Sequence, residues 1–290
     1  MSAIGFRCPN GDTVKFKECL EGHCDHRCMA LPALNAAEKS THHWFGKPSV
    51  TQLLAPTRIM YLSLKSEYYI DPLGTISAMI GTNSHKAFED AVPDGWKAEV
   101  RLEDDITSGA FDSYDPNTKT LFDWKFYGAY KIAKMIGMTP KWEKKTIMRG
   151  KRKGQEQWIQ TFVSGGVKWT HDVAWQLNYY RLLMRKHGYP AEHMYVNCFV
   201  RGGVDKTARS YGITKASYLI PINFISDKWV RLYFKTKHDR LMYALKHNEM
   251  PPVCSKSERW DTSKSYPDRR CRDYCSVNQF CPYYKENYGG

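Results

Sequence analysis

The sequence predicts a mixed α/β fold in which a sheet of mixed strand direction is flanked by helices. Two observations lead to this prediction: helix-like and strand-like segments alternate along the middle of the chain, and clusters of cysteines lie near both ends. A chain of 290 residues, 42% of them hydrophobic, can bury a large core, so a disordered chain is excluded. We expect this core over residues 36–250, between Cys-rich modules at 1–35 and 251–290.

The first elements of the core are a helix and three strands. Residues 74–91 are expected to form the helix, with Ile76 and Ile80 on its apolar stripe and the stop signal Pro93-Asp94-Gly95 after it. The turn signal Asp115-Pro116-Asn117-Thr118-Lys119 joins the last two strands into a predicted hairpin. The three strands are expected at residues 96–106, 108–114 and 120–126.

The second half of the core begins with a lysine-rich insertion at about residues 131–170. A helix is expected over residues 172–187, because Gly188 and Pro190 follow a helical pattern. A strand at residues 194–201 and a helix at residues 225–247 complete the core, and Pro251-Pro252 marks the entry to the last module.

The predicted hairpin brings three charged side chains together. If Tyr114 pairs with Leu121, then Asp112 lies opposite Asp123 with Cβ atoms about 5 Å apart, and strand alternation places Lys125 on the same face. Two carboxylates this close favour a bound Mg²⁺ or Mn²⁺, and a lysine beside the metal can orient or deprotonate water and offset the charge on a phosphate. An Asp-x-Lys triplet is also typical of a solvated surface pair, which is the alternative interpretation.

Two helices offer further candidates. His85 lies one helical turn after Gly81 in the first helix and could supply a nitrogen ligand that favours manganese. Glu99, on the strand that follows, is a weaker candidate for an outer carboxylate. Gln176 and Tyr180 share one face of the second helix, where they could hydrogen-bond a phosphate or orient the lysine.

Taken in order, these motifs resemble the RecB-like branch of the PD-(D/E)XK nuclease superfamily, which includes CRISPR-associated exonucleases and their phage relatives. The motifs of that branch are a helical histidine, a G-x-x-D strand, a (D/E)-x-K strand and a Q-x-x-x-Y helix. The resemblance covers roughly residues 48–281. It implies a restriction-endonuclease-like fold and a metal-dependent deoxyribonuclease, an exonuclease acting on single-stranded DNA or DNA ends.

The resemblance also implies a role for each residue. The metal would be held by His85, Asp112, Asp123 and the backbone carbonyl of Trp124. Lys125 would be the catalytic lysine, with Asp112 and Asp123 in the catalytic set and with Gln176 and Tyr180 supporting the substrate and the lysine.

Nine cysteines suggest metal sites rather than disulfides, because the first residues lack the apolar stretch of a secretion signal and a reducing compartment keeps thiols free. Two disulfide-stapled ends are the alternative. The N-terminal group is most simply a Zn²⁺ site with four thiolate ligands. It consists of Cys8, Cys19, Cys24 and Cys28.

The C-terminal cysteines enter the resemblance as well. Similar nucleases hold a [4Fe-4S] cluster with one cysteine before the core and three after it, and Cys271, Cys275 and Cys281 resemble those three with one extra residue. The leading cysteine is missing from its usual place beside Pro56, so either Cys254 or Cys28 could complete the set. Zn²⁺ is the alternative to the cluster.

A net charge of +13 and a basic run in the insertion predict a nucleic-acid partner. Trp142 and Trp158 accompany the run, which favours single-stranded DNA over a duplex, although such a run can also be a solvated loop. The predicted DNA-binding residues are Lys141, Lys144, Lys145, Arg149, Lys151, Arg152 and Lys153.

Two other functions are considered beside the nuclease: a non-catalytic, zinc-containing nucleic-acid-binding protein on the same fold, and a nuclease subunit that is active only in a larger complex. Recombination or spacer-acquisition proteins would then be partners. No membrane partner is expected, because no apolar run approaches the roughly 20 residues of a membrane helix. We expect a cytoplasmic location in a bacterial, archaeal or phage-infected cell.

Overall fold

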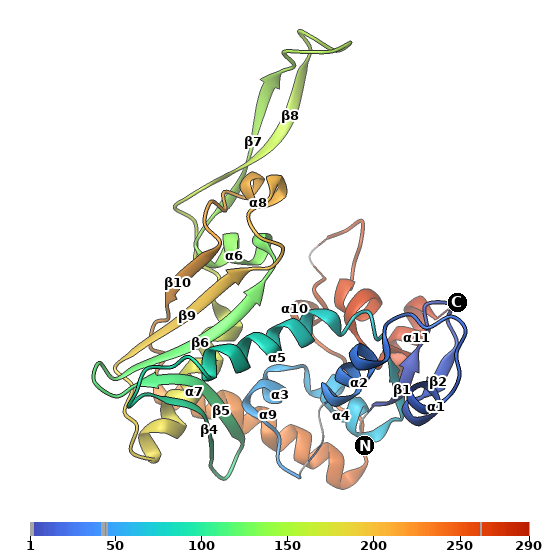
Figure 1. Ribbon diagram of the computed structural model, residues 1–290, viewed down its shortest axis with the longest axis vertical. Coiled ribbons are helices and arrows are strands. Elements are labelled where there is room, and N and C mark those ends of the chain that lie inside the picture. Colours follow the sequence, from blue (N-terminus) through green and yellow to red (C-terminus); the bar gives the residue numbers. More distant parts are fainter. Residues whose placement is uncertain (1–2, 42–43, 45, 262, 290) are drawn as a thin grey trace. The chain divides into compact units, whose positions relative to one another are not determined.

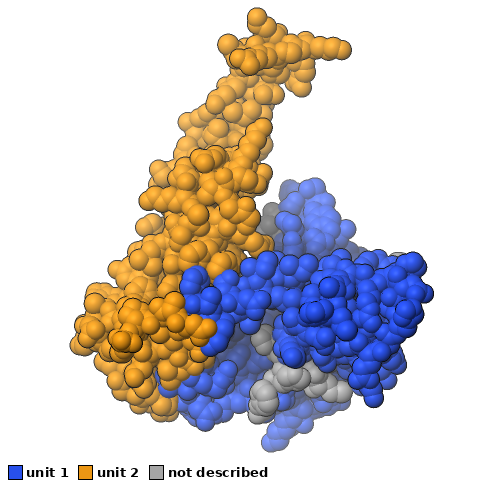
Figure 2. Space-filling model, viewed as in Figure 1, with its two compact units in different colours: residues 1–88, 101–109, 227–290 blue, residues 89–100, 110–226 orange. Residues whose placement is uncertain are grey.

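The computed structural model describes residues 3–41, 44, 46–261 and 263–289 of the chain. These residues form two compact units, which Figure 2 draws in different colours. Unit 1 comprises residues 1–88, 101–109 and 227–290, and unit 2 comprises residues 89–100 and 110–226. Both Cys-rich segments therefore belong to unit 1, whereas the core expected over residues 36–250 contributes to both units.

A five-stranded mixed sheet dominates unit 2 (Figure 1). Its strand order is β10-β9-β6-β5-β4, with β5 antiparallel to β6, β6 parallel to β9, and β9 antiparallel to β10. The last residues of β4 and the first two of β5 are assigned to unit 1. The strands are β4 (Lys97–Glu103), β5 (Ser108–Asp115), β6 (Thr120–Tyr127), β9 (His193–Val200) and β10 (Ser217–Pro221).

The two faces of β6 differ in composition. Phe122 stacks on Trp96, Trp124 and Tyr195 with ring centroids 5.4, 6.2 and 5.9 Å apart, so these aromatic residues cover one face of the strand. Leu121, Asp123 and Lys125 alternate with them and face the other side. The charged residues of the strand are thereby separated from its aromatic residues.

Three helices and a hairpin complete unit 2. Helix α7 (His171–Lys186) is buried over most of its length, and Asn178 ties it to the segment after β10 through bonds with Asn223 and Ile225. The other helices are α6 (Ala129–Met135) and α8 (Lys206–Ser210). A separate two-stranded hairpin consists of β7 (Thr139–Thr146) and β8 (Glu156–Val163).

Unit 1 contains a small sheet of order β2-β1-β3 and most of the helices. Phe6, Leu34 and Ala37 form a core cluster beside this sheet. The strands are β1 (Ala3–Arg7), β2 (Thr13–Lys15) and β3 (Tyr68–Ile70). The helices are α1 (Phe16–Glu21), α2 (Leu31–Lys39), α3 (Val50–Leu54), α4 (Thr57–Lys65), α5 (Ile76–Glu89), α9 (Asp227–His247), α10 (Lys256–Arg259) and α11 (Pro282–Tyr288), with a π-helical turn η1 (Arg270–Tyr274) and a 3₁₀ turn η2 (Asn278–Phe280).

The structure confirms a mixed α/β fold with a mixed sheet flanked by helices, and the expected elements of the core are present as α5, β4, β5, β6, α7, β9 and α9. The stripe expected on α5 is not buried: Ile76 and Ile80 are 42% and 45% exposed. Met79 instead packs against the core cluster. Among the described residues, no helix combines the length and apolarity that crossing a membrane requires.

Candidate active site

The turn between β5 and β6 fixes the positions of the predicted carboxylates. The carboxylate of Asp115 accepts bonds from the backbone N–H of Asn117 at 3.0 Å and from the hydroxyl of Thr118 at 2.6 Å, which closes the turn. Tyr114 pairs with Leu121, and this predicted register is confirmed. The ladder continues to Ser113 opposite Phe122, so Asp112 and Asp123 are the next residue on each strand.

Lys125 and Asp123 form an ion pair inside unit 2. The Lys125 Nζ atom lies 2.8 Å from the Asp123 carboxylate, and the two side chains are 18% and 1% exposed. Burial lowers the pKa of Lys125, but attraction to Asp123 and Asp112 outweighs burial and raises that pKa above its ordinary value. Lys125 is therefore a cation at neutral pH when no metal is bound, and the alternative of a solvated surface pair does not describe this pair.

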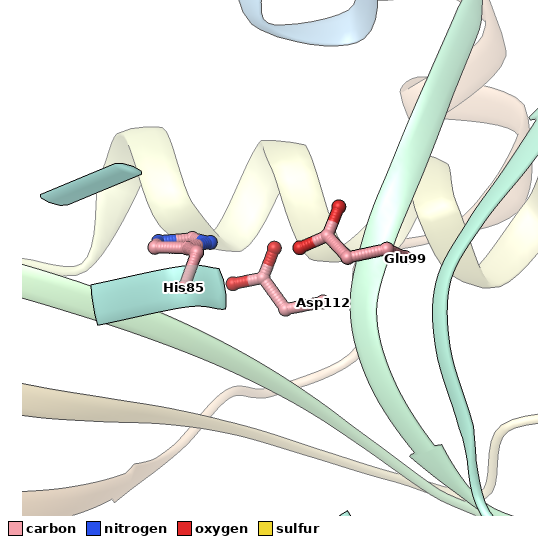
Figure 3. A group of neighbouring side chains, drawn as sticks. All are labelled: His85, Glu99 and Asp112. Atoms are coloured by element: carbon pink, nitrogen blue, oxygen red, sulfur yellow. The ribbon is translucent and has the colours of Figure 1, made fainter. Parts of the chain in front are cut away.

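A second carboxylate pair lies on the neighbouring strands. The Asp112 carboxylate is buried and accepts a bond from the backbone N–H of Trp124 at 2.7 Å. A ligand oxygen of Glu99 lies within 4.8 Å of one from Asp112, and Figure 3 shows these two carboxylates side by side. Figure 3 also draws His85, which belongs to α5 in unit 1, so its role as a ligand stays a prediction.

The backbone at Glu99 is strained. Glu99 has φ +49° within β4, a left-handed conformation that costs a side-chain-bearing residue about 1–2 kcal/mol. Such strain within a strand is typical of positions where the direction of a side chain matters. Sequence reasoning ranked Glu99 as a weak candidate, because a positive φ leaves no signal in the local sequence. In the structure a Glu99 carboxylate oxygen lies within 4.8 Å of one from Asp112.

Helix α7 supplies the two predicted polar residues. Gln176 and Tyr180 are buried, and the Gln176 Nε2 atom donates to the Tyr180 hydroxyl at 3.4 Å. Burial raises the pKa of Tyr180; the bond from Gln176 opposes this rise, and the Asp123 charge adds to it. The phenol thus stays protonated and lies within electrostatic reach of Asp123 and Lys125, so α7 and β6 line one charged site.

Three residues near this site were not predicted as part of it. The Lys131 Nζ atom lies 3.7 Å from the ring centroid of Tyr127, and burial lowers the pKa of Lys131. Burial raises the pKa of the Cys198 thiol to about 12, so this cysteine is an unreactive core residue. Lys131 belongs to α6 and Lys125 to β6, so no single helical or strand repeat relates the two positions.

The composition of the site suits a hard divalent cation. Glu99, Asp112 and Asp123 provide oxygen ligands in or near the sheet of unit 2, and the Trp124 carbonyl belongs to the same strand as Asp123. The donor set therefore fits Mg²⁺ or Mn²⁺, while the sequence prediction of which atoms bind the ion stays a prediction.

The C-terminal thiols form a second candidate site, which lies within unit 1. Arg58 donates to the Cys281 Sγ atom at 3.5 Å and to the Pro251 carbonyl at 2.8 Å, so it links α4 to the last module. The four thiols line one cavity with Arg58, which favours Cys254 over Cys28 as the fourth member of the group. The thiols that line it are Cys254, Cys271, Cys275 and Cys281.

Neither described cysteine group has three sulfurs as close together as a bound zinc ion would hold them. Sulfurs on a tetrahedral zinc ion lie about 3.8 Å apart, since each Zn–S bond is about 2.3 Å. Among the described residues, no three Sγ atoms lie within 4.8 Å of one another. Burial, with a smaller effect of nearby negative groups, raises the pKa of Cys254, Cys271 and Cys275 to about 11, so these thiols are protonated at neutral pH before metal binds.

The N-terminal cysteines lie around the small sheet of unit 1. Cys19 and Cys28 pack against the core cluster, and Cys24 is exposed. The pKa of Cys8 and of Cys19 is raised, mainly by burial and also by the other thiols of the group, so the four are near one another. All nine cysteines of the chain are free thiols in the structure. Zinc binding here stays a prediction.

The predicted DNA-binding residues lie on the β7–β8 hairpin and the turn that joins its strands. All seven are exposed. The sequence did not predict a hairpin here, because a run of lysines hides the alternation that identifies strands.

Comparisons with protein-family models, with curated proteins and with solved structures find no significant match for this chain. Its function must therefore be argued from its own residues.

Lys125→Met is expected to lower the free energy of unfolding by about 3 kcal/mol in EDTA, because it removes the lysine that the buried Asp123 carboxylate contacts. Adding Asp123→Asn should restore most of this loss. Urea denaturation followed by circular dichroism measures both effects. The matched control is Lys119→Met, which removes the exposed Lys119–Glu192 pair and should cost less than about 1 kcal/mol. Equal costs for the two lysines would contradict a buried pair.

Metal binding at the C-terminal thiols is expected to tighten as pH rises. The folded-state pKa values of about 11 lie above neutral pH, so binding displaces protons, and each displaced proton contributes about tenfold per pH unit. Titration with Co²⁺, followed by its thiolate absorbance at about pH 6.5 and about pH 8, measures this dependence. Cys254→Ser should weaken the C-terminal site, whereas Cys28→Ser should leave it intact. The reverse pattern would identify Cys28 as the fourth ligand.

Proposed function

We propose that the chain is a divalent-metal-dependent deoxyribonuclease with a PD-(D/E)XK arrangement of the RecB-like type. The observation that carries this proposal is the buried Asp123–Lys125 pair on β6, in which Asp123 lies one position beyond the last β5–β6 ladder pair. A surface ion pair would not be buried in this way, and a structural pair would not need further carboxylates on the neighbouring strands. Asp112 and Glu99 are those carboxylates.

The carboxylates are the residues that would hold the metal. Asp112, Asp123 and Glu99 offer oxygen atoms from three neighbouring strands, and His85 is the proposed nitrogen ligand. A divalent ion at such a site supplies a more acidic water and stabilises negative charge on a phosphate. The chain's part is to fix the carboxylates before DNA arrives, and the bond from the Trp124 N–H does this for Asp112.

Lys125 acts as a cation rather than as a base in this proposal. Its pKa is raised by the same carboxylates that attract the metal, so the ammonium holds its proton and can donate a hydrogen bond to a phosphate oxygen or to water. Metal binding would neutralise part of the carboxylate charge and bring this pKa down again. Lys125 therefore orients the attacking water and balances charge on the phosphate.

Helix α7 supplies residues that would contact the substrate. The Tyr180 hydroxyl accepts a bond from Gln176, which leaves the phenolic proton available for a phosphate oxygen or for Asp123. Lys131, with a pKa lowered by burial, adds a second positive charge that can be offered to the scissile strand. Exonuclease action on single strands or DNA ends remains the proposed form of the activity.

The thiol sites have a structural role in this proposal. The cavity shared by the C-terminal thiols supports one four-thiolate site with Cys254 as the fourth ligand; a [4Fe-4S] cluster is proposed there, with Zn²⁺ as the alternative. Zn²⁺ is proposed for the N-terminal group. Either group, once bound, would fix segments of unit 1 that have little apolar core of their own.

Wild-type protein is expected to degrade end-labelled single-stranded DNA with Mn²⁺ or Mg²⁺ and to stop in EDTA. Lys125→Ala should slow cleavage at least about 100-fold with nearly unchanged DNA binding, because the lysine acts on the reacting phosphate. Gel assays of cleavage and anisotropy assays of binding measure the two effects. Lys119→Ala, in the adjoining turn, is the matched control and should cleave normally. Full activity in folded Lys125→Ala, or no cleavage with either metal, would overturn the proposal in favour of a non-catalytic binder.

Glu99→Gln is expected to weaken Mn²⁺ binding about 10-fold or more, because it removes a charged ligand beside Asp112. The rise in melting temperature that Mn²⁺ causes should become smaller. Glu103→Gln, on the same strand but exposed and paired with Lys47, is the control and should behave as wild type. Identical Mn²⁺ responses for the two variants would remove Glu99 from the metal site.

A further inference from the structure

The β7–β8 hairpin has two different faces. Lys144 pairs with Trp158 and Trp142 pairs with Gln160, so strand alternation places Trp142, Lys144 and Trp158 on one face. We call this the indole face. Lys141, which pairs with Thr161, belongs to the opposite face. The two tryptophans are diagonal neighbours across the hairpin, an arrangement that brings large side chains within reach of each other.

The indole face is open to solvent. Trp142 and Trp158 are 60% and 61% exposed, and Lys144 lies over the Trp158 ring with its Nζ atom 5.7 Å from the ring centroid. In Figure 2 the hairpin lies at one end of unit 2, beyond the five-stranded sheet. Two exposed indoles do not stabilise a two-stranded hairpin that lacks a core, and such exposed aromatic surface is typical of binding sites.

The base of the hairpin is fixed by further aromatic residues. Phe162, which pairs with Pro140, belongs to the indole face. Its ring packs edge-on against Tyr130 of α6 and Tyr211, with centroids 6.3 and 5.1 Å apart. The backbone bond from Gly166 N–H to the Gly137 carbonyl, 2.8 Å long, closes the base. The hairpin is thus held at its base while the indoles farther along it stay exposed.

The charge of the hairpin identifies the class of partner. Residues 139–163 contain seven lysines and arginines against two glutamates, a net charge of 7 − 2 = +5. The two glutamates pair with Lys141 and Lys144 at 3.0 and 3.1 Å. Among the described residues, the other five cations form no ion pair: Lys145, Arg149, Lys151, Arg152 and Lys153. A polyanion matches this surface.

Exposed indoles beside unpaired cations suit a strand whose bases are accessible. Bases stack on aromatic rings at about 1–3 kcal/mol each, whatever their sequence, but the bases of a duplex are already stacked on one another. A duplex could therefore use the cations but not the indoles. The indoles would therefore distinguish unpaired from paired strands by stacking, and the cations would hold the strand through phosphate contacts.

We propose that the indole face of the β7–β8 hairpin is a stacking platform for single-stranded DNA, with the bases on Trp142 and Trp158 and the phosphates on the cations of the turn. The choice of DNA rests on the proposed nuclease function, whereas stacking itself requires no cleavage. The platform gives the nuclease its preference for single strands.

The test measures binding by the full chain in EDTA, where no cleavage can occur. Fluorescein-labelled oligothymidylate and a duplex of equal length are titrated, and anisotropy gives both affinities. The double variant Trp142→Ala/Trp158→Ala is expected to bind the single strand at least about 10-fold more weakly and the duplex less than about twofold more weakly. Trp229→Ala, which removes a tryptophan of α9 that is 58% exposed, is the matched control and should bind both as wild type.

A second pair of measurements separates stacking from folding. Phenylalanine at both positions should retain most of the single-strand affinity, because a ring remains for stacking. A strand containing 2-aminopurine should lose fluorescence on binding to the wild type and lose less on binding to the alanine variant. Circular dichroism should show the same melting temperature for all variants, since both indoles are exposed.

Three outcomes would overturn the platform. These are unchanged single-strand affinity in the folded alanine variant, an equal loss for single strand and duplex, and a loss confined to binding of vesicles that contain anionic lipid. Asp123→Asn serves to separate this proposal from the nuclease. That variant should bind single strands as wild type does. If the wild-type protein needs its indoles for binding but never cleaves DNA, the stacking platform is supported and the proposed nuclease function is refuted.

Discussion

In unit 2, the pairing of β5 with β6 fixes which side chains can meet. Tyr114 opposite Leu121 is the register that keeps Asp123 and Lys125 away from the aromatic side of the sheet. A slip of one residue would exchange the two faces of β6, so that aromatic rings would lie where the carboxylates now lie. The Asp115 side chain closes the turn through its own backbone and thereby selects the register. A local turn preference therefore decides where the charged residues of β5 and β6 lie relative to one another.

The electrostatics of the site follow from that register. The sheet gathers carboxylates on adjoining strands, and the one buried lysine among them is held by attraction to two of these carboxylates. Carboxylates this close repel one another unless positive charge lies between them. Under the proposed function, a divalent ion would supply that charge. Stability and chemistry depend here on the same few side chains, and this is common where function requires local strain.

Much of this site could be predicted because its signals are local. A Pro-Asn turn between alternating residues predicted the hairpin, and the Gly188 stop predicted the end of α7. The strained backbone at Glu99 could not be predicted, because it depends on tertiary contacts rather than on neighbouring residues. The β7–β8 hairpin was missed for a different reason: its strands have no buried side, so they lack the alternation of apolar residues that marks most strands. The choice between Cys254 and Cys28 also needed the fold, since sequence separation does not determine which thiols share a cavity.

The left-handed backbone at Glu99 has an evolutionary consequence. Glycine is the residue that adopts this conformation without steric cost, so a single exchange to glycine would relax the strand and erase the carboxylate together. Under the proposed function, random drift toward a less strained backbone would also remove a metal ligand. A lineage that retains an acidic residue at this position does so against the conformational preference of its own backbone, and glycine at this position among descendants of this chain would be a sign that the proposed metal site has been lost.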